Sequence, residues 1–435
     1  MAEVTNQAVT SHRKRSRGLD AGDILVFVIP CLQFIQLKVI GVLNGSDLLL
    51  LATFLYLAGR GRIRVTTPVG KSFLVFCSLW LFSQCVTDIV RHTPFVDYAR
   101  GWSNIGMTLV NFTVLYILMY GRPRRLMLFG WGFVAGSLLL FFFNPDEFIR
   151  GDPWKFGLAY PATFIVLLLA SRATCRGHWP IALTLLIGSI NIYLGSRNMG
   201  GACMAAALYQ LTTYYLGRSR KQGVKLKHRT VAAIAASIIL GAIASFLAYQ
   251  YTASTGILGE EARSKYEGES TGAYGVLLGG RPEMLGSIPA IYDSPILGHG
   301  SWARDPTYLI LEIQSAMALG YKNAIDISPE DFSEGNIPKH SCILGAWVDA
   351  GILGAIFWGW VLVLTVRVLA RVYPPTVVLL PIMSFIAFAL LWDILFSPYG
   401  ARARIIAPYY IVMLATCMSM APYKVTPATA AVAKS

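Results

Sequence analysis

The sequence has few charged residues for its length. Only 14% of the 435 residues are Asp, Glu, Lys or Arg, whereas 55% are hydrophobic. The apolar residues form runs of roughly 15 to 22 residues that recur along the chain, long enough for a helix to cross a bilayer. This composition excludes an ordinary soluble domain and predicts an all-α integral membrane protein, a polytopic bundle of helices.

Several motifs that carry chemistry are missing from the sequence. It has no phosphate-binding Gly-rich loop, no His-Glu-x-x-His helix and no Gly-x-Ser-x-Gly elbow. The stretch GHGSWA at 298–303 has the glycines of a dinucleotide site, but neither a strand nor a crossover helix accompanies it. Seven cysteines, mostly within apolar runs, indicate neither a disulfide framework nor a thiolate metal site. We therefore expect no metal and no cofactor.

The net charge of +14 does not indicate nucleic acid, because the basic residues are dispersed in short segments between apolar runs. Placing the N-terminus in the cytoplasm puts several basic clusters on one side, as the positive-inside rule expects. These clusters are Arg13–Arg17, Arg60–Arg64, Arg122–Arg125 and Arg218–Arg229. The basic residues thus predict the topology, and the first span should remain as an anchor because no cleavage site follows it.

The apolar runs predict ten to twelve membrane spans, with about twelve as the preferred number. They lie near residues 24–43, 47–59, 71–90, 102–120, 126–143, 157–171, 180–195, 201–216, 230–250, 341–366, 374–396 and 405–421. The predicted organisation is a cytoplasmic basic tail at 1–22, spans one to nine at 23–250, one large periplasmic loop at 251–339, spans ten to twelve at 340–423 and a cytoplasmic tail at 424–435.

Four arginines are predicted on the outer side, where basic residues are disfavoured. Arg197 lies in the turn LGSRNMGGA, Arg281 lies in the large loop, and Arg402 and Arg404 occupy the last outer turn beside Asp393. Simpler explanations remain open for each. Arg197 could contact a lipid phosphate, Arg281 could pair with Glu283, and Asp393 could form a salt bridge with Arg402 or Arg404.

The run KHSCILGAWVDAGILGAIFW begins at Lys339 and places His340 where a helix would enter the bilayer from outside. The positive end of that helix and the neighbouring Lys339 should lower the pKa of His340. A neutral imidazole could then act as a general base. Alternatively, His340 only caps the helix, and Gly351 and Gly354 form a packing seam with another span.

The pattern of His340, Ser341, nine residues, Gly351, two residues and Gly354 resembles the signature of the bacterial O-antigen ligase family. That family includes O-antigen and exopolysaccharide polymerases and protein oligosaccharyltransferases. Further similarity lies in Ser196-Arg197, Gly280-Arg281 and the stretch SPILGHG at 294–300, so that the resemblance covers mainly 190–365. One departure is Ser341, because relatives often have Asn after the histidine.

The resemblance implies a GT-C-like, metal-independent and inverting glycosyltransferase in the bacterial inner membrane, with its active site facing the periplasm. The donor would be a glycan on undecaprenyl diphosphate and the acceptor the lipid A-core. His340 would be the base, and the catalytic Arg197 and Arg281, with Arg402 and Arg404, would bind the diphosphate. A Wzy-type polymerase that elongates a second lipid-linked glycan remains open, as does a lipid-linked glycan flippase or transporter.

Overall fold

The computed structural model describes residues 18–172, 177–221, 249–257, 259–275, 279–321, 334–374 and 377–420. Within these ranges the chain is mostly helical, with one two-stranded antiparallel sheet. The predicted span at 230–250 lies almost entirely outside the described residues, as do residues 1–17 and the whole tail at 424–435.

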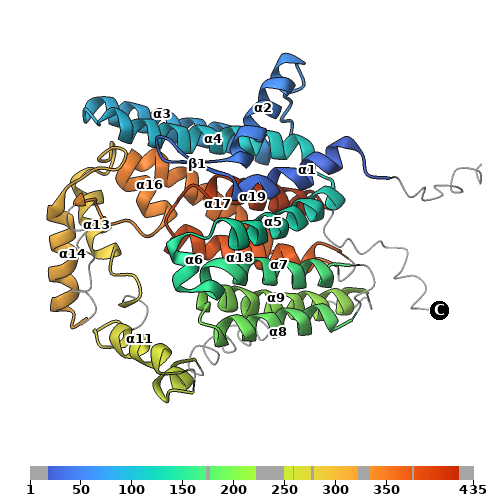
Figure 1. Ribbon diagram of the computed structural model, residues 1–435. Helices are drawn as coiled ribbons and strands as arrows, with labels where there is room; N and C mark the ends of the chain where they lie inside the picture. The colour runs from blue at the N-terminus through green and yellow to red at the C-terminus, as the bar shows by residue number, and fades with distance from the viewer. Residues whose placement is uncertain are drawn as a thin grey trace, which may run out of the picture.

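Most of the described helices lie side by side in one bundle (Figure 1). In chain order they are α1 (Ala21–Cys31), α2 (Gly45–Gly59), α3 (Pro68–Val90), α4 (Phe95–Met119), α5 (Pro123–Phe143), α6 (Glu147–Gly151), the π-helix η2 (Pro153–Leu158), α7 (Ala159–Ala170), α8 (Trp179–Tyr193), α9 (Arg197–Lys221), α16 (Cys342–Ala350), α17 (Ile352–Leu369), α18 (Leu380–Phe396) and α19 (Ala403–Ser419).

Five helical segments of the described chain are long and apolar enough to cross a membrane. They are Pro68–Val90, Phe95–Met119, Pro123–Phe143, Pro153–Ala170 and Ile352–Leu369. Shorter apolar helices, among them α8, α18 and α19, pack beside them. The chain is therefore a mostly helical protein of the membrane type, whereas the predicted number of twelve spans is not confirmed.

The prediction of one span at 24–43 is wrong. Helix α1 ends at Cys31 and is followed by a 3-10 turn (Leu32–Phe34) and by the antiparallel strands β1 (Gln36–Lys38) and β2 (Val42–Asn44). The apolar run contains polar residues just after the end of α1. Among them is Gln33, which is buried and donates hydrogen bonds to the Phe133 carbonyl and the Ser137 hydroxyl, both at 3.2 Å.

Helices α18 and α19 form the centre of the bundle. Most side chains of both are buried, and they contact helices on several sides, including α4, α9 and α17. A helix that is apolar around its whole circumference is expected in such a position, because no face of it favours water.

The apolar run at 341–366 also does not form one continuous helix, contrary to the prediction. Gly351 has a φ of +67°, which ends α16 and starts α17 in a new direction. A Cβ atom at Gly351 would lie 1.9 Å from the Ile296 carbonyl oxygen, so that only glycine fits this close backbone contact. Gly354 is packed against Ala346 and Trp80 in the same corner.

We expect Gly351→Ala to lower the free energy of unfolding by about 3 kcal/mol or more, because alanine is strained at positive φ and collides with Ile296. The thermal midpoint of the detergent-purified protein measures this loss. Gly359→Ala on α17 is a matched control, since a Cβ atom there meets nothing within 4 Å. Equal midpoints for the two variants would contradict the role assigned to this corner.

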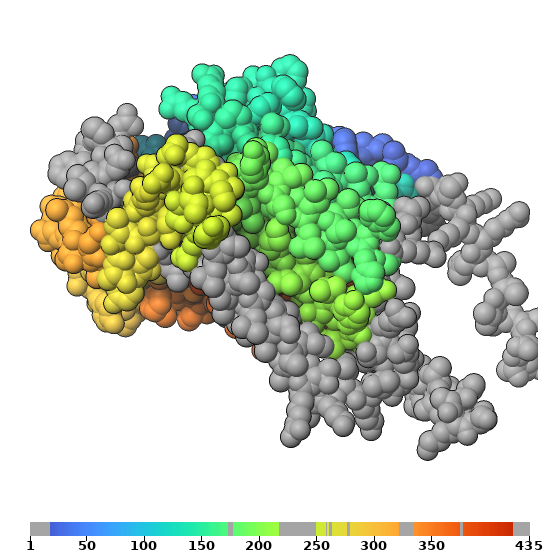
Figure 2. All heavy atoms as spheres, turned by 90° about the horizontal axis from the view of Figure 1, so that it is seen from below, coloured from blue at the N-terminus to red at the C-terminus, as the bar shows by residue number. Residues whose placement is uncertain are grey.

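The segment predicted as one large loop contains the helices α11 (Glu260–Ser270), α13 (Met284–Asp293) and α14 (Pro306–Ala318). They lie at the end of the bundle opposite the start of α1 (Figure 1). Figure 2, seen from below, shows α11 in yellow beside the green helices α8 and α9. The segment thus contacts one end of the bundle and carries Arg281 and Glu283 to the start of α16.

Candidate functional site

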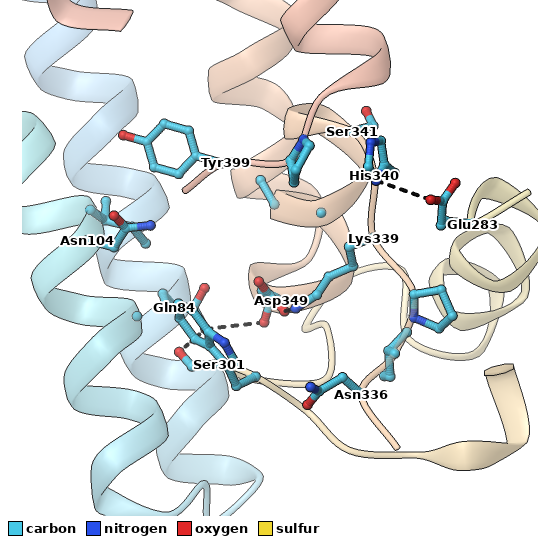
Figure 3. Close-up of a pocket in the computed structure, with 18 of the residues that line it drawn as sticks. Gln84, Asn104, Glu283, Ser301, Asn336, Lys339, His340, Ser341, Asp349 and Tyr399 are labelled. Atoms are coloured by element: carbon cyan, nitrogen blue, oxygen red, sulfur yellow. Dashed lines mark hydrogen bonds and ion pairs between the residues drawn. The ribbon is translucent and has the colours of Figure 1, made fainter. Parts of the chain in front are cut away.

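A cavity of about 550 Å³ lies where this segment meets the bundle. Its walls come from α3, α4, α14, α16 and the stretches before α13 and α16. Figure 3 shows the polar side chains that line it. They are Gln84, Asn104, Glu283, Ser301, Asn336, Lys339, His340, Ser341, Asp349 and Tyr399.

His340 lies directly before α16, as the sequence predicted. Ser341 is the N-cap of that helix, because its hydroxyl accepts a hydrogen bond from the Leu344 N–H at 3.2 Å. The same hydroxyl donates to the Ile394 carbonyl at 2.9 Å, which ties the start of α16 to α18. Ser341 therefore serves as the cap of this helix.

The imidazole of His340 is paired with a carboxylate. Its Nδ1 lies 3.2 Å from Oε1 of Glu283, and both side chains are about one-third exposed at the cavity wall (Figure 3). From the sequence, Glu283 was expected only as a salt-bridge partner of Arg281, and its contact with His340 was not predicted. The signal that could have identified it is its position two residues after Arg281, within the same short Gly-Arg-Pro-Glu turn.

The pKa of His340 lies below its usual value, in the direction predicted. Burial is the main cause, and the positive charge of Arg281 lowers the pKa further, whereas Glu283 raises it. The predicted contribution of Lys339 is not seen, because the Lys339 ammonium pairs with Asp349 at 2.6 Å. His340 is therefore mainly neutral at pH 7.

Arg281 is half-buried next to this pair. Its Nε donates to the Phe396 carbonyl at 3.1 Å, and its guanidinium lies 5.7 Å from the centre of the Trp392 ring. No salt bridge to a carboxylate is found for it among the described residues, so the expected alternative of an ion pair with Glu283 is not observed. Arg281 thus keeps a positive charge that a ligand could neutralise.

Arg197 begins α9 and is held by two loop residues. Its fork donates two hydrogen bonds of 2.8 Å to the Glu269 carboxylate and one of 2.7 Å to the Tyr249 hydroxyl. A bidentate pair of this kind fixes the guanidinium firmly. An anion that bound this guanidinium through the same fork would have to displace Glu269.

The electrostatics connect these groups. Burial lowers the pKa of Arg281, the carboxylates of Glu283 and Glu269 raise it, and Arg197 lowers it further, so the two guanidinium groups lie within electrostatic range of each other. Lys155 on η2 is within the same range of both arginines and was not predicted. Arg281 is therefore in electrostatic range of His340, Arg197 and Lys155.

Arg402 and Arg404 are not brought together with Arg281. Arg404 is buried in the bundle and paired with Asp47 at 2.8 Å. Arg402 faces a second cavity of about 200 Å³, with its guanidinium 5.6 Å from the Tyr160 ring. Within the described residues neither arginine forms the expected salt bridge with Asp393.

The stretch SPILGHG at 294–300 forms part of the support behind the cavity. The His299 N–H donates to the Val348 carbonyl at 2.7 Å, and the Gly300 N–H donates to Asp349 at 3.0 Å. Asp88 at the end of α3 accepts from the Ser301 N–H at 2.6 Å and from its hydroxyl at 2.8 Å. Asp88 is thus a structural acid that holds the loop against the bundle.

We compared the chain with known proteins by family and by sequence. No family model matches it, and no curated protein matches it.

Proposed function

We propose that this protein is a membrane glycosyltransferase of the O-antigen ligase type. In this proposal it transfers a glycan from undecaprenyl diphosphate to an acceptor sugar hydroxyl on the lipid A-core, at the periplasmic face of the bacterial inner membrane. The observation that supports it most directly is His340, which is paired with Glu283 at the wall of a cavity and lies within electrostatic range of Arg281.

The pairing with Glu283 suits His340 for general base catalysis. If Nδ1–H donates to the carboxylate, Nε2 carries a lone pair that can accept a proton. His340 would remove the proton of the acceptor hydroxyl as its oxygen attacks the anomeric carbon. The new carbon–oxygen bond forms while the bond to the diphosphate oxygen breaks, and the electron pair leaves with the lipid diphosphate. A single displacement of this kind inverts the anomeric centre.

The cations would stabilise the departing diphosphate. The positive charge of Arg281 lowers the pKa of His340. Arg281 forms no salt bridge with a carboxylate among the described residues. Arg197 would join after the diphosphate displaces Glu269, and Lys155 adds a third positive charge. Preorganised positive charge of this type acts where negative charge develops in the transition state.

A Wzy-type polymerase remains the second candidate, because the same groups would serve if the acceptor were another lipid-linked glycan. A flippase or transporter would need its charged groups near the middle of the membrane. Here Arg197, Arg281 and His340 belong to the end of the bundle that carries α11 and α13 (Figure 1). This arrangement supports an enzyme over a transporter.

Reconstitution of the purified protein tests the proposal. The protein in liposomes is given undecaprenyl diphosphate glycan and either lipid A-core or additional donor, in the presence of a chelator. We expect one ligated product on the lipid A-core. A ladder of products on the lipid carrier would favour the polymerase, and movement of donor across the bilayer without any transfer would favour the flippase.

We expect Arg281→Lys to reduce the transfer rate by about tenfold to a hundredfold, because lysine keeps the charge but loses the planar fork that fits phosphate oxygens. Initial rates at saturating acceptor measure this. Arg263→Lys is the matched control, since Arg263 lies on the surface of α11 and pairs only with Glu260 and Glu267. An unchanged rate for Arg281→Lys would remove Arg281 from the donor site.

A further inference from the structure

The wall of the main cavity that faces away from Glu283 carries polar groups without partners. Asn104 on α4 and Trp80 on α3 line the cavity and are more than nine-tenths buried. Within the part of the chain that the structure describes, neither the Asn104 Oδ1 nor the Trp80 Nε1 has a hydrogen-bond partner. Figure 3 shows Asn104 and Tyr399 on the opposite side from Glu283. Buried polar groups in this state favour a ligand that offers both donors and acceptors.

An aromatic ring lies elsewhere on the same cavity. Trp302 lines it, is 36% exposed and has a φ of +50°. A bulky residue at positive φ is strained, and such strain is retained mainly where it presents a side chain for a purpose. The Lys339 ammonium lies 6.0 Å from the centre of the Trp302 ring, and the rest of this partly exposed indole suits the C–H groups of a sugar ring, whose hydroxyl groups point outward from the ring edge.

The charge of the cavity restricts the ligand further. The ionisable groups that line it, besides the Tyr399 phenol and the neutral His340, are the carboxyl groups of Glu283, Glu312 and Asp349 and the ammonium of Lys339. Lys339 is already paired with Asp349. Three carboxyl groups against one ammonium disfavour a phosphorylated or acidic ligand.

We propose that this cavity is the acceptor subsite and that it binds a neutral sugar residue, with Trp302 under the ring and Asn104 and Trp80 bonded to its hydroxyl groups. This inference rests on the proposed function for its role in transfer. The neutral sugar would occupy the side of His340 away from Arg281, so that donor phosphate and acceptor sugar approach the imidazole from two directions.

Direct binding tests the subsite without any transfer. The probes are the methyl glycosides of glucose, galactose and N-acetylglucosamine and the 6-phosphates of the same sugars, measured by saturation-transfer NMR on the full-length protein in nanodiscs. We expect at least one neutral glycoside to bind and its 6-phosphate to bind about tenfold more weakly. Failure of all three neutral glycosides, or equal binding of a sugar and its phosphate, would overturn the inference.

Substitutions in the cavity wall test whether the sugar binds there. Asn104→Leu should weaken the neutral glycoside about tenfold through the lost hydrogen bonds, and Trp302→Ala should weaken it similarly. Asn144→Leu and Trp179→Ala, both at exposed positions outside the lining, are the controls. Trp302→Ala keeps the test valid if Asn104→Leu does not fold. Unchanged binding in Trp302→Ala and in a folded Asn104→Leu would refute the assignment.

Transfer assays separate this inference from the proposed function. If both hold, Trp302→Ala raises the KM for the acceptor about tenfold and leaves the KM for the donor unchanged. If Trp302→Ala transfers glycan with an unchanged KM for the acceptor, the acceptor subsite is rejected and the proposed function stands. Sugar binding without any transfer by the wild-type protein would reject the enzyme and retain the subsite.

Discussion

Replacement of His340 by alanine is expected to lower the rate of glycan transfer by about 10²- to 10⁴-fold, with little change in stability. The loss reflects removal of the group that accepts the hydroxyl proton in the transition state. Single-turnover transfer with reconstituted protein measures it. His178→Ala is the control, because His178 is exposed before α8 and its ring contacts only Tyr214 and Tyr215. A wild-type transfer rate in His340→Ala would show that His340 is not the general base.

The pH dependence of the wild-type rate tests the same group. A base must be neutral, so the rate should fall as pH falls through the His340 pKa, which lies below 6.5. Glu283→Gln removes the negative charge that raises this pKa. The acidic limb of the profile should therefore move to lower pH, while the maximal rate falls about tenfold because the imidazole is less well oriented. An acidic limb that stays in place in Glu283→Gln would contradict the pairing.

Asp47→Asn is expected to destabilise the protein by about 3 to 5 kcal/mol, because it leaves the buried guanidinium of Arg404 without its counter-charge. Asp47 is 1% exposed, Arg404 donates to it at 2.8 Å, and Asn111 donates to the other carboxylate oxygen at 3.0 Å. The thermal midpoint in detergent measures the loss. Replacing both partners by apolar residues of similar size should restore most of the stability, since no charge then remains buried.

A surface pair provides the control for this prediction. Arg263 lies 2.8 Å from Glu267, and their side chains are 45% and 58% exposed, so that Arg263→Ala should cost no more than about 1 kcal/mol. If Arg404 bound the diphosphate instead, Asp47→Asn would change the KM for the donor and leave the thermal midpoint where it is. That result would support the prediction from the sequence that Arg404 binds the diphosphate of the donor.

Several parts of the site could be predicted because they depend on local chain chemistry. The apolar run after His340 predicts a helix that starts beside it, and the structure has α16 there, although Ser341 caps the helix and the alternative of a His340 cap is wrong. The lowered pKa of His340 was predicted without its main cause, burial, because the neighbours that bury His340 come from segments distant in sequence. Arg281 and Glu283 in particular lie more than fifty residues before it.

The partners of the arginines show the same limit. Nothing near Arg197 in the sequence indicates Glu269, and nothing near Arg404 indicates Asp47. A guanidinium pairs with whichever carboxylate the fold brings within about 3 Å, and that choice is made by helix packing. The placement of these arginines between apolar runs could therefore be predicted from the sequence, but their partners could not.

The sequence by itself determined the class of protein, because hydrophobicity is summed along each run and does not depend on neighbours. The spacing of the residues around His340 predicts a functional site there. Only the tertiary structure decided that the run at 341–366 breaks at Gly351 against Ile296, that His340 meets Glu283, and that Asn104 and Trp302 share one cavity. These contacts join segments far apart in the chain, and their energies arise only when the helices pack.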